Sequence, residues 1–160
     1  MRVHYLLNFK IVSVLKTGDK APHFNGIDQN GNIIQLSDFA GKNLVLYFYP
    51  KDNTPGCTAQ ACNLRDNYAA LLKAGYAVVG ISADNEKSHQ KFIEKFNLPF
   101  PLIADSDKVI LNAYGVWGPK KFLGRSYDGI HRTTFIISKD EIISEIIEKV
   151  DTKNHTNQII

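Results

Sequence analysis

Residues 45–57 read Val-Leu-Tyr-Phe-Tyr-Pro-Lys-Asp-Asn-Thr-Pro-Gly-Cys and join an apolar, strand-forming run to a segment rich in turn residues. The apolar run predicts a strand that is buried on both faces. The turn residues predict a sharp end to this strand and place Cys57 at the start of a helix. The free backbone N–H groups and the positive dipole end at a helix start favour a thiolate over a thiol. We therefore expect Cys57 to be reactive.

A second cysteine, Cys62, follows Cys57 by five positions on the predicted helix. On ideal helix geometry this spacing separates the two Cα atoms by about 8.6 Å. A disulfide requires a separation below about 7 Å. The two cysteines therefore either never bond to each other, or bond only when the first turns of the helix unwind.

The size and composition indicate one globular domain with its own core. The chain has 160 residues, a net charge of +3, two cysteines and five histidines. No basic stretch predicts a nucleic-acid surface, and no apolar run approaches the roughly 18 residues that a membrane span needs. Two cysteines are too few for a disulfide scaffold, so we expect a cytoplasmic protein whose cysteines are catalytic or buried in the core. The histidines form no ligand spacing with the cysteines, so no metal site is expected.

The first residues are expected to form an extension rather than a cleaved signal peptide. Asn8 and Lys10 interrupt the apolar run there, and no small-residue cleavage site follows it. We therefore predict an extension over residues 1–14, or an extra edge strand from Lys10 to Leu15. A single domain is predicted over residues 15–160.

Strands alternate with helices along the rest of the chain. The dipeptide Asn30-Gly31 predicts a hairpin, and apolar runs or helical spacing predict the other elements. Strands are expected at residues 44–49, 76–82 and 102–104, helices at 58–74, 86–97, 108–114 and 150–160, and a closing hairpin at 133–138 and 141–147. This order predicts an α/β fold, with a mixed β-sheet flanked by helices.

The motif that ends at Cys57 resembles the active-site signature of the peroxiredoxins, a Pro-x-x-x-Thr-x-x-Cys pattern. The cysteine spacing is similar to that of the bacterioferritin comigratory protein branch, also called peroxiredoxin Q. Further blocks similar to this family lie at residues 18–24, 114–118 and 127–135, and the resemblance covers about residues 15–154. It implies a thioredoxin-like fold and the reduction of hydrogen peroxide and organic hydroperoxides, without metal, haem or flavin.

The resemblance also implies a role for each residue of the motif. Cys57 is expected to be the peroxidatic cysteine, and Cys62 the resolving cysteine. Thr54 and Arg132 would complete the peroxide pocket, and Pro50 would shield it. A sulfenic acid on the first cysteine would condense with the second, and thioredoxin or glutaredoxin would reduce the resulting disulfide. Members of this branch are often monomers, so we expect a monomer that binds neither nucleic acid nor membranes.

Each of these residues also has a plainer interpretation. Cys57 and Cys62 could be inert buried thiols, since cysteine is among the most buried residue types. Arg132 could form a surface ion pair, and Gln60 could either support the pocket or lie in solvent. His131 is expected to point away from the pocket, because neighbouring strand residues face opposite sides.

Two other functions are compatible with a reactive cysteine. A thioredoxin-type disulfide oxidoreductase uses two cysteines separated by two residues, whereas four residues separate them in this chain. A non-enzymatic redox sensor would need a partner surface that the sequence does not indicate. Reduction of insulin disulfides separates the oxidoreductase from a peroxidase, and consumption of peroxide separates the sensor from it.

Overall fold

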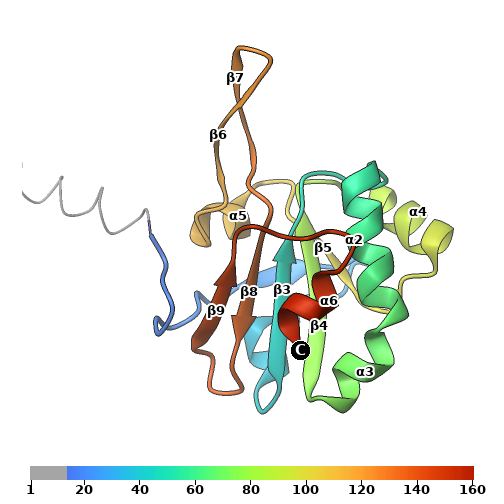
Figure 1. The fold of residues 1–160 in the computed structure, drawn as a ribbon, viewed down its shortest axis with the longest axis vertical. Helices are drawn as coiled ribbons and strands as arrows, with labels where there is room; N and C mark the ends of the chain where they lie inside the picture. Colours follow the sequence, from blue (N-terminus) through green and yellow to red (C-terminus); the bar gives the residue numbers. More distant parts are fainter. Residues whose placement is uncertain (1–13) are drawn as a thin grey trace, which may run out of the picture.

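The computed structural model describes residues 14–160, in which strands and helices alternate (Figure 1). In chain order the elements are β1 (Asn25–Ile27), β2 (Ile33–Gln35), the 3-10 helix η1 (Leu36–Phe39), β3 (Asn43–Phe48), α2 (Pro55–Asp66), α3 (Tyr68–Lys73), β4 (Tyr76–Ser82), α4 (Glu86–Phe96), β5 (Leu102–Ala104), α5 (Val109–Ala113), β6 (Trp117–Phe122), β7 (Arg125–Ile130), β8 (Thr133–Ile137), β9 (Ile143–Ile147) and α6 (His155–Ile159).

A five-stranded mixed sheet forms the centre of the fold, in the order β5-β4-β3-β8-β9. β3, β4 and β5 are parallel to one another, whereas β8 runs antiparallel to both β3 and β9. The predicted mixed α/β sheet is therefore confirmed. β3 is the middle strand of the five, so the loop that follows it begins at the middle of the sheet, beyond the carboxyl end of this strand.

The side chains of β3 alternate between two cores, one on each face of the sheet. Leu46 and Phe48 belong to the core that also contains residues of α5. Val45 and Tyr47 belong to the core that contains residues of α2, α3 and α4. In Figure 1, α6 lies in front of β3 and β4 and beside α2. Burial on both faces explains why the sequence of this strand is almost entirely apolar.

The single helix predicted over residues 58–74 is wrong in two respects. The helix begins earlier, at Pro55, and it is interrupted at Asn67, so that α2 and α3 are separate helices. Proline suits the first helical position because the N–H group that it lacks has no partner there. The Asn67 side chain donates to the carbonyl oxygen of Asn63 at 2.8 Å. An asparagine that bonds to nearby backbone in this way competes with the helix.

The hairpin of β6 and β7 was not predicted and projects beyond the sheet (Figure 1). Most of its residues are partly or fully exposed, so it lacks the alternating apolar pattern that identifies a half-buried strand. Its turn is Leu123-Gly124, with φ angles of 52° and 78°. Two positive φ angles are typical of a type I′ hairpin turn, but leucine is an unusual residue in that position.

The other predicted elements are present with small shifts in their ends. The first hairpin connects β1 to β2 through residues 28–32, which contain Asn30-Gly31, and its turn is closed by the hydrogen bond from the Gly31 N–H to the Asp28 carbonyl oxygen; the closing hairpin is formed by β8 and β9. The last helix is shorter than expected and begins only at His155. The extension over residues 1–14 and the edge strand from Lys10 to Leu15 fall almost wholly outside the described residues, although Leu15 itself is not in a strand. Among the helices of residues 14–160, none has the length and apolar character that a bilayer span requires.

Candidate active site

Cys57 lies in the first turn of α2, immediately beyond the loop that leaves β3. Thr54 is the residue before the helix, Pro55 is its first residue, and the Cys57 side chain is buried, with 2% of its surface exposed. The first backbone N–H groups of a helix have no partner within it. The sulfur is therefore enclosed by the core on one side and faces the positive end of the helix on the other.

Arg132 reaches Cys57 from the segment between β7 and β8. Its Nη2 donates to the Cys57 Sγ at 3.4 Å, and its Nη1 donates to the Gln60 Oε1 at 2.7 Å. A guanidinium next to a sulfur stabilises the thiolate, and it does not lose its proton at any ordinary pH. The alternative of a surface ion pair is wrong for Arg132, because its guanidinium is directed to these two side chains.

Gly56 makes this approach possible. A Cβ atom at that position would lie 3.2 Å from the Nη2 of Arg132, closer than such contacts normally are. The glycine next to the cysteine therefore serves to admit the arginine, since its φ angle is not one that requires glycine.

Gln60 is fully buried one turn beyond Cys57, so the interpretation of Gln60 as a solvated residue is wrong. Within residues 14–160 its Nε2 has no hydrogen-bond partner, and neither has the buried hydroxyl group of Tyr47. Burial raises the pKa of Tyr47 well above its ordinary value, and the negative charges of Cys57 and Asp52 raise it further. The tyrosine therefore remains a phenol, with a hydrogen to donate. Nothing in the sequence distinguished Tyr47 as a site residue, because its place in the alternation of β3 indicated only a core position.

Thr54 and Pro50 lie on the loop between β3 and α2. The Thr54 hydroxyl donates to the carbonyl oxygen of Lys51 at 2.8 Å. Because this bond uses its only hydrogen, the hydroxyl keeps its lone pairs to accept a hydrogen bond from a ligand. Pro50 is partly buried, two positions after the last residue of β3.

Cys62 is partly buried on the same helix, and both cysteines are free. α2 continues without interruption through both residues. The structure therefore has the intact helix in which the spacing excludes a disulfide. His131, next to Arg132, is exposed and its Nε2 lies 3.1 Å from the carbonyl oxygen of Pro119. As expected, it points away from the cysteine.

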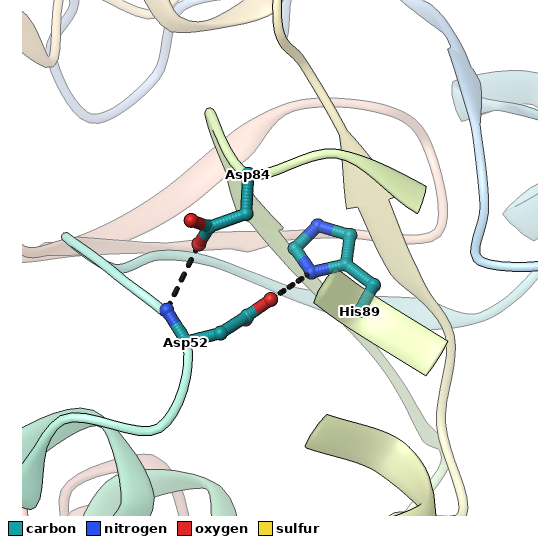
Figure 2. A group of neighbouring side chains, drawn as sticks. All are labelled: Asp52, Asp84 and His89. Atoms are coloured by element: carbon teal, nitrogen blue, oxygen red, sulfur yellow. Dashed lines mark hydrogen bonds and ion pairs between the residues drawn. The ribbon is translucent and has the colours of Figure 1, made fainter. Parts of the chain in front are cut away.

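A second polar cluster, which the sequence did not indicate, lies beside the same loop. Asp52, Asp84 and His89 each bring a possible ligand atom within 4.8 Å of the others (Figure 2). These atoms already make hydrogen bonds to groups of the protein: the Asp84 Oδ2 accepts from the Asp52 backbone N–H at 2.9 Å, and the His89 Nδ1 lies 2.7 Å from the Asp52 Oδ2. A metal ion would have to displace these bonds, so the donor set fits a hydrogen-bonded network better than a metal centre.

The chain is similar to known proteins over most of its length. The sequence pattern of the AhpC/TSA family matches residues 17–146. Peroxiredoxin Bcp of Escherichia coli (strain K12) is 47% identical over 146 residues, which cover 91% of this chain and 94% of that protein.

Solved structures resemble it over a comparable length. A cysteine-to-serine mutant of Xylella fastidiosa PrxQ has a TM-score of 0.86 and 32% identity, and the match covers 92% of this chain and 94% of that one. A structure of the Xanthomonas campestris bacterioferritin comigratory protein, described in connection with its alkyl peroxide reduction activity, has a TM-score of 0.80 and 33% identity, over 85% and 87% of the two chains. The thioredoxin-like peroxiredoxin fold is thereby confirmed, and the chain belongs to the AhpC/TSA family.

Proposed function

We propose that this chain is a thiol-dependent peroxidase that reduces hydrogen peroxide and organic hydroperoxides through Cys57. The observation that carries the proposal is the guanidinium of Arg132, 3.4 Å from a buried cysteine sulfur at the start of α2. The similarity to peroxiredoxin Bcp, and to a protein whose structure was described with alkyl peroxide reduction, supports the same reaction.

In the first step, the Cys57 thiolate attacks one oxygen of the peroxide and the O–O bond breaks. The sulfur becomes a sulfenic acid, and the other oxygen leaves as hydroxide or alkoxide, which takes from the solvent the proton that the Cys57 thiol had released and becomes water or an alcohol. Negative charge develops on the leaving oxygen as the bond lengthens. Arg132 and the backbone N–H groups at the start of α2 are placed to stabilise that charge. Thr54, whose lone pairs are free, would accept a hydrogen bond from the peroxide and orient it.

In the second step, the thiol of Cys62 attacks the sulfenic sulfur, a disulfide forms and water leaves. Because α2 is continuous through both cysteines, the helix must unwind between them before they can meet. We propose that a dithiol protein such as thioredoxin or glutaredoxin then reduces the disulfide by exchange. We further propose that the chain acts as a monomer in the cytoplasm.

The decisive experiment is the intact mass after one equivalent of hydrogen peroxide without reductant. We expect a loss of about two mass units, which corresponds to a disulfide between Cys57 and Cys62. A gain of about sixteen or thirty-two units would mean that Cys57 reacts but is not resolved internally. An unchanged mass would contradict the peroxidase.

Turnover assays separate the peroxidase from its alternatives. Peroxide consumption that depends on thioredoxin is expected, and it would be missing in a redox sensor that does not turn over. Rapid reduction of insulin disulfides would instead indicate a thioredoxin-type oxidoreductase, which has two residues between its cysteines rather than the four of this chain.

A further inference from the structure

The loop that connects β3 to α2 is anchored at Asp52, a residue of which only 7% of the surface is exposed. Its Oδ1 accepts from the Tyr49 hydroxyl at 2.6 Å, and its Oδ2 accepts from the Ser88 hydroxyl at 2.8 Å. His89, from α4, completes the set with its Nδ1 at 2.7 Å from the Oδ2. The Asp52 backbone N–H donates to Asp84 at 2.9 Å. Three side chains therefore hold the side chain of Asp52, and a fourth holds its backbone N–H. All of them lie outside the loop except Tyr49, which is its first residue.

The hydrogen bonds of His89 determine where its protons are. Its Nε2 lies 2.9 Å from the carbonyl oxygen of Ile103, which can only accept, so the Nε2 carries a hydrogen. Its Nδ1 faces a carboxylate oxygen of Asp52, so a further proton must lie between these two atoms (Figure 2). The hydroxyl groups of Tyr49 and Ser88 donate to the two oxygens of the same side chain. One proton thus joins the His89 Nδ1 to the Asp52 Oδ2, and His89 is fully buried.

The anchored residue lies between the two ends of the proposed peroxide pocket. Pro50 precedes Asp52 by two positions, and Thr54 follows it by two. The Thr54 hydroxyl is oriented by the carbonyl oxygen of Lys51, the residue next to Asp52. Asn53, between Asp52 and Thr54, has a φ of 60°, a left-handed conformation that asparagine adopts more readily than most other residues and that turns the chain sharply at this point.

We propose that Asp52 and His89 are positioning residues for peroxide reduction. Their buried hydrogen bond fixes the backbone of the loop and thereby directs the Thr54 hydroxyl toward the peroxide, without touching the peroxide itself. This inference rests on the proposed function. It predicts that loss of the pair impairs the reaction with peroxide more than the intrinsic reactivity of the Cys57 thiolate.

The test compares two reactions of Cys57 in the full chain: oxidation by hydrogen peroxide and alkylation by iodoacetamide. Asp52→Ala is expected to lower the rate constant for peroxide at least tenfold and that for iodoacetamide less than threefold. Asp52→Asn should recover most of the rate, because its amide can donate to the His89 Nδ1 and to Ser88 while its oxygen accepts from Tyr49. The control is Leu111→Ala, which truncates a fully buried side chain in the core on the opposite face of the sheet. It should lower the thermal midpoint but leave both rate constants within twofold.

Two outcomes would overturn the proposal. The first is a peroxide rate constant in a folded Asp52→Ala variant that stays within twofold of the parent. The second is an Asp52→Asn variant that is as slow as Asp52→Ala. If Asp52→Ala does not fold, the comparison of Asp52→Asn with His89→Ala, which breaks the pair from the other side, decides in the same way. Failure of the proposed function is distinct, because the parent protein itself would then not consume hydrogen peroxide.

Discussion

Cys57 owes its surroundings to three residues with different roles. Gln60 holds one nitrogen of the Arg132 guanidinium, and the cysteine sulfur accepts from the other. Gly56 leaves the space through which this arginine approaches. The glutamine and the glycine therefore act through the position of a single cation.

Substitution of each cysteine should separate the two chemical steps. Cys57→Ser is expected to abolish peroxide consumption, because a serine hydroxyl is a far weaker nucleophile than a thiolate. Cys62→Ser should retain the first oxidation but block turnover with thioredoxin. Intact mass and a coupled thioredoxin assay measure these effects. Full turnover of the Cys62 variant would show that another thiol resolves the sulfenic acid.

Replacement of the guanidinium should slow the first step strongly. Arg132→Gln is expected to lower the rate constant for hydrogen peroxide by roughly 10² to 10³, the range found when one donor to a developing oxyanion is removed. Arg132→Lys should fall in between, because an ammonium keeps the charge but not the paired donors. Stopped-flow measurement of a single oxidation gives these constants. Equal rates for the two variants would mean that the charge alone contributes nothing.

Gly56→Ala should separate stability from reactivity. Alanine is a better helix former than glycine by about 0.5–1 kcal/mol, so the free energy of unfolding should stay constant or rise. The added Cβ displaces the Arg132 guanidinium by a few tenths of an ångström. We expect a loss of roughly tenfold in the peroxide rate constant, less than the 10²-fold that a 1 Å displacement can cause. Denaturant unfolding and stopped-flow oxidation test both parts, and an unchanged rate would show that the guanidinium shifts without consequence.

At the scale of the elements, α2 is held differently at its two ends. Its first turn, which carries Cys57, is contacted by the Arg132 side chain. Its later part is joined to α6 by the Asn63 side chain. The Asn63 Oδ1 accepts from the backbone N–H and the hydroxyl of Thr156, both at 2.8 Å, and its Nδ2 donates to the carbonyl oxygen of Lys153 at 2.9 Å. These bonds begin directly after Cys62. Unwinding of α2 between the cysteines would therefore stop where α6 is attached.

Amide hydrogen exchange tests this local unwinding. We expect faster exchange over residues 57–62 in the oxidised protein than in the reduced one. Asn63→Ala should cost about 1–3 kcal/mol for its lost hydrogen bonds and extend the fast exchange into the rest of α2 and α6. The matched control is Asn157→Ala, at an exposed position of α6. Identical exchange in the two redox states would contradict the unwinding step.

At the scale of the whole molecule, the stability should depend on the buried histidine His155. Its Nε2 lies 2.8 Å from the Thr134 hydroxyl of β8, and its Nδ1 lies 2.7 Å from the Oε1 of Gln158, so it joins α6 to the central sheet. Burial lowers the pKa of His155 below its ordinary value of 6.5, and the charge of Arg132 lowers it further, although Gln158 and Asp151 act in the opposite direction. The unfolded chain therefore binds this proton more readily than the folded one.

This difference gives the sign of the pH dependence. The contribution of His155 to stability is complete above pH 6.5, and it is lost as the pH falls through the lowered pKa of the folded state. His155→Gln should therefore lose less unfolding free energy than the parent between pH 7.5 and pH 5, as measured by denaturant titration. His23→Gln, at an exposed histidine, should behave like the parent. Parallel curves for His155→Gln and the parent would contradict the assignment.

Short-range patterns determined the fold class, the strands of the central sheet and the position of Cys57 at a helix start. These features follow from local alternation of apolar residues and from turn residues, which act over a few positions. The same patterns missed the break at Asn67 and the hairpin of β6 and β7. In those two places a side-chain hydrogen bond and an exposed surface outweigh the local apolar pattern.

Apart from the family resemblance, which pointed to Arg132, only the tertiary structure decided which distant groups surround the cysteine. Arg132 is 75 positions from Cys57, and His89 is 37 positions from Asp52. The residues next to Arg132 and His89 do not specify these contacts. The first contact exists because β8 pairs with β3, and the second because α4 packs against the face of the sheet that α2 also covers. The sequence by itself determined that a reactive cysteine follows a buried strand. The packing of strands and helices determined which cation reaches its sulfur and which hydrogen-bonded pair holds its loop.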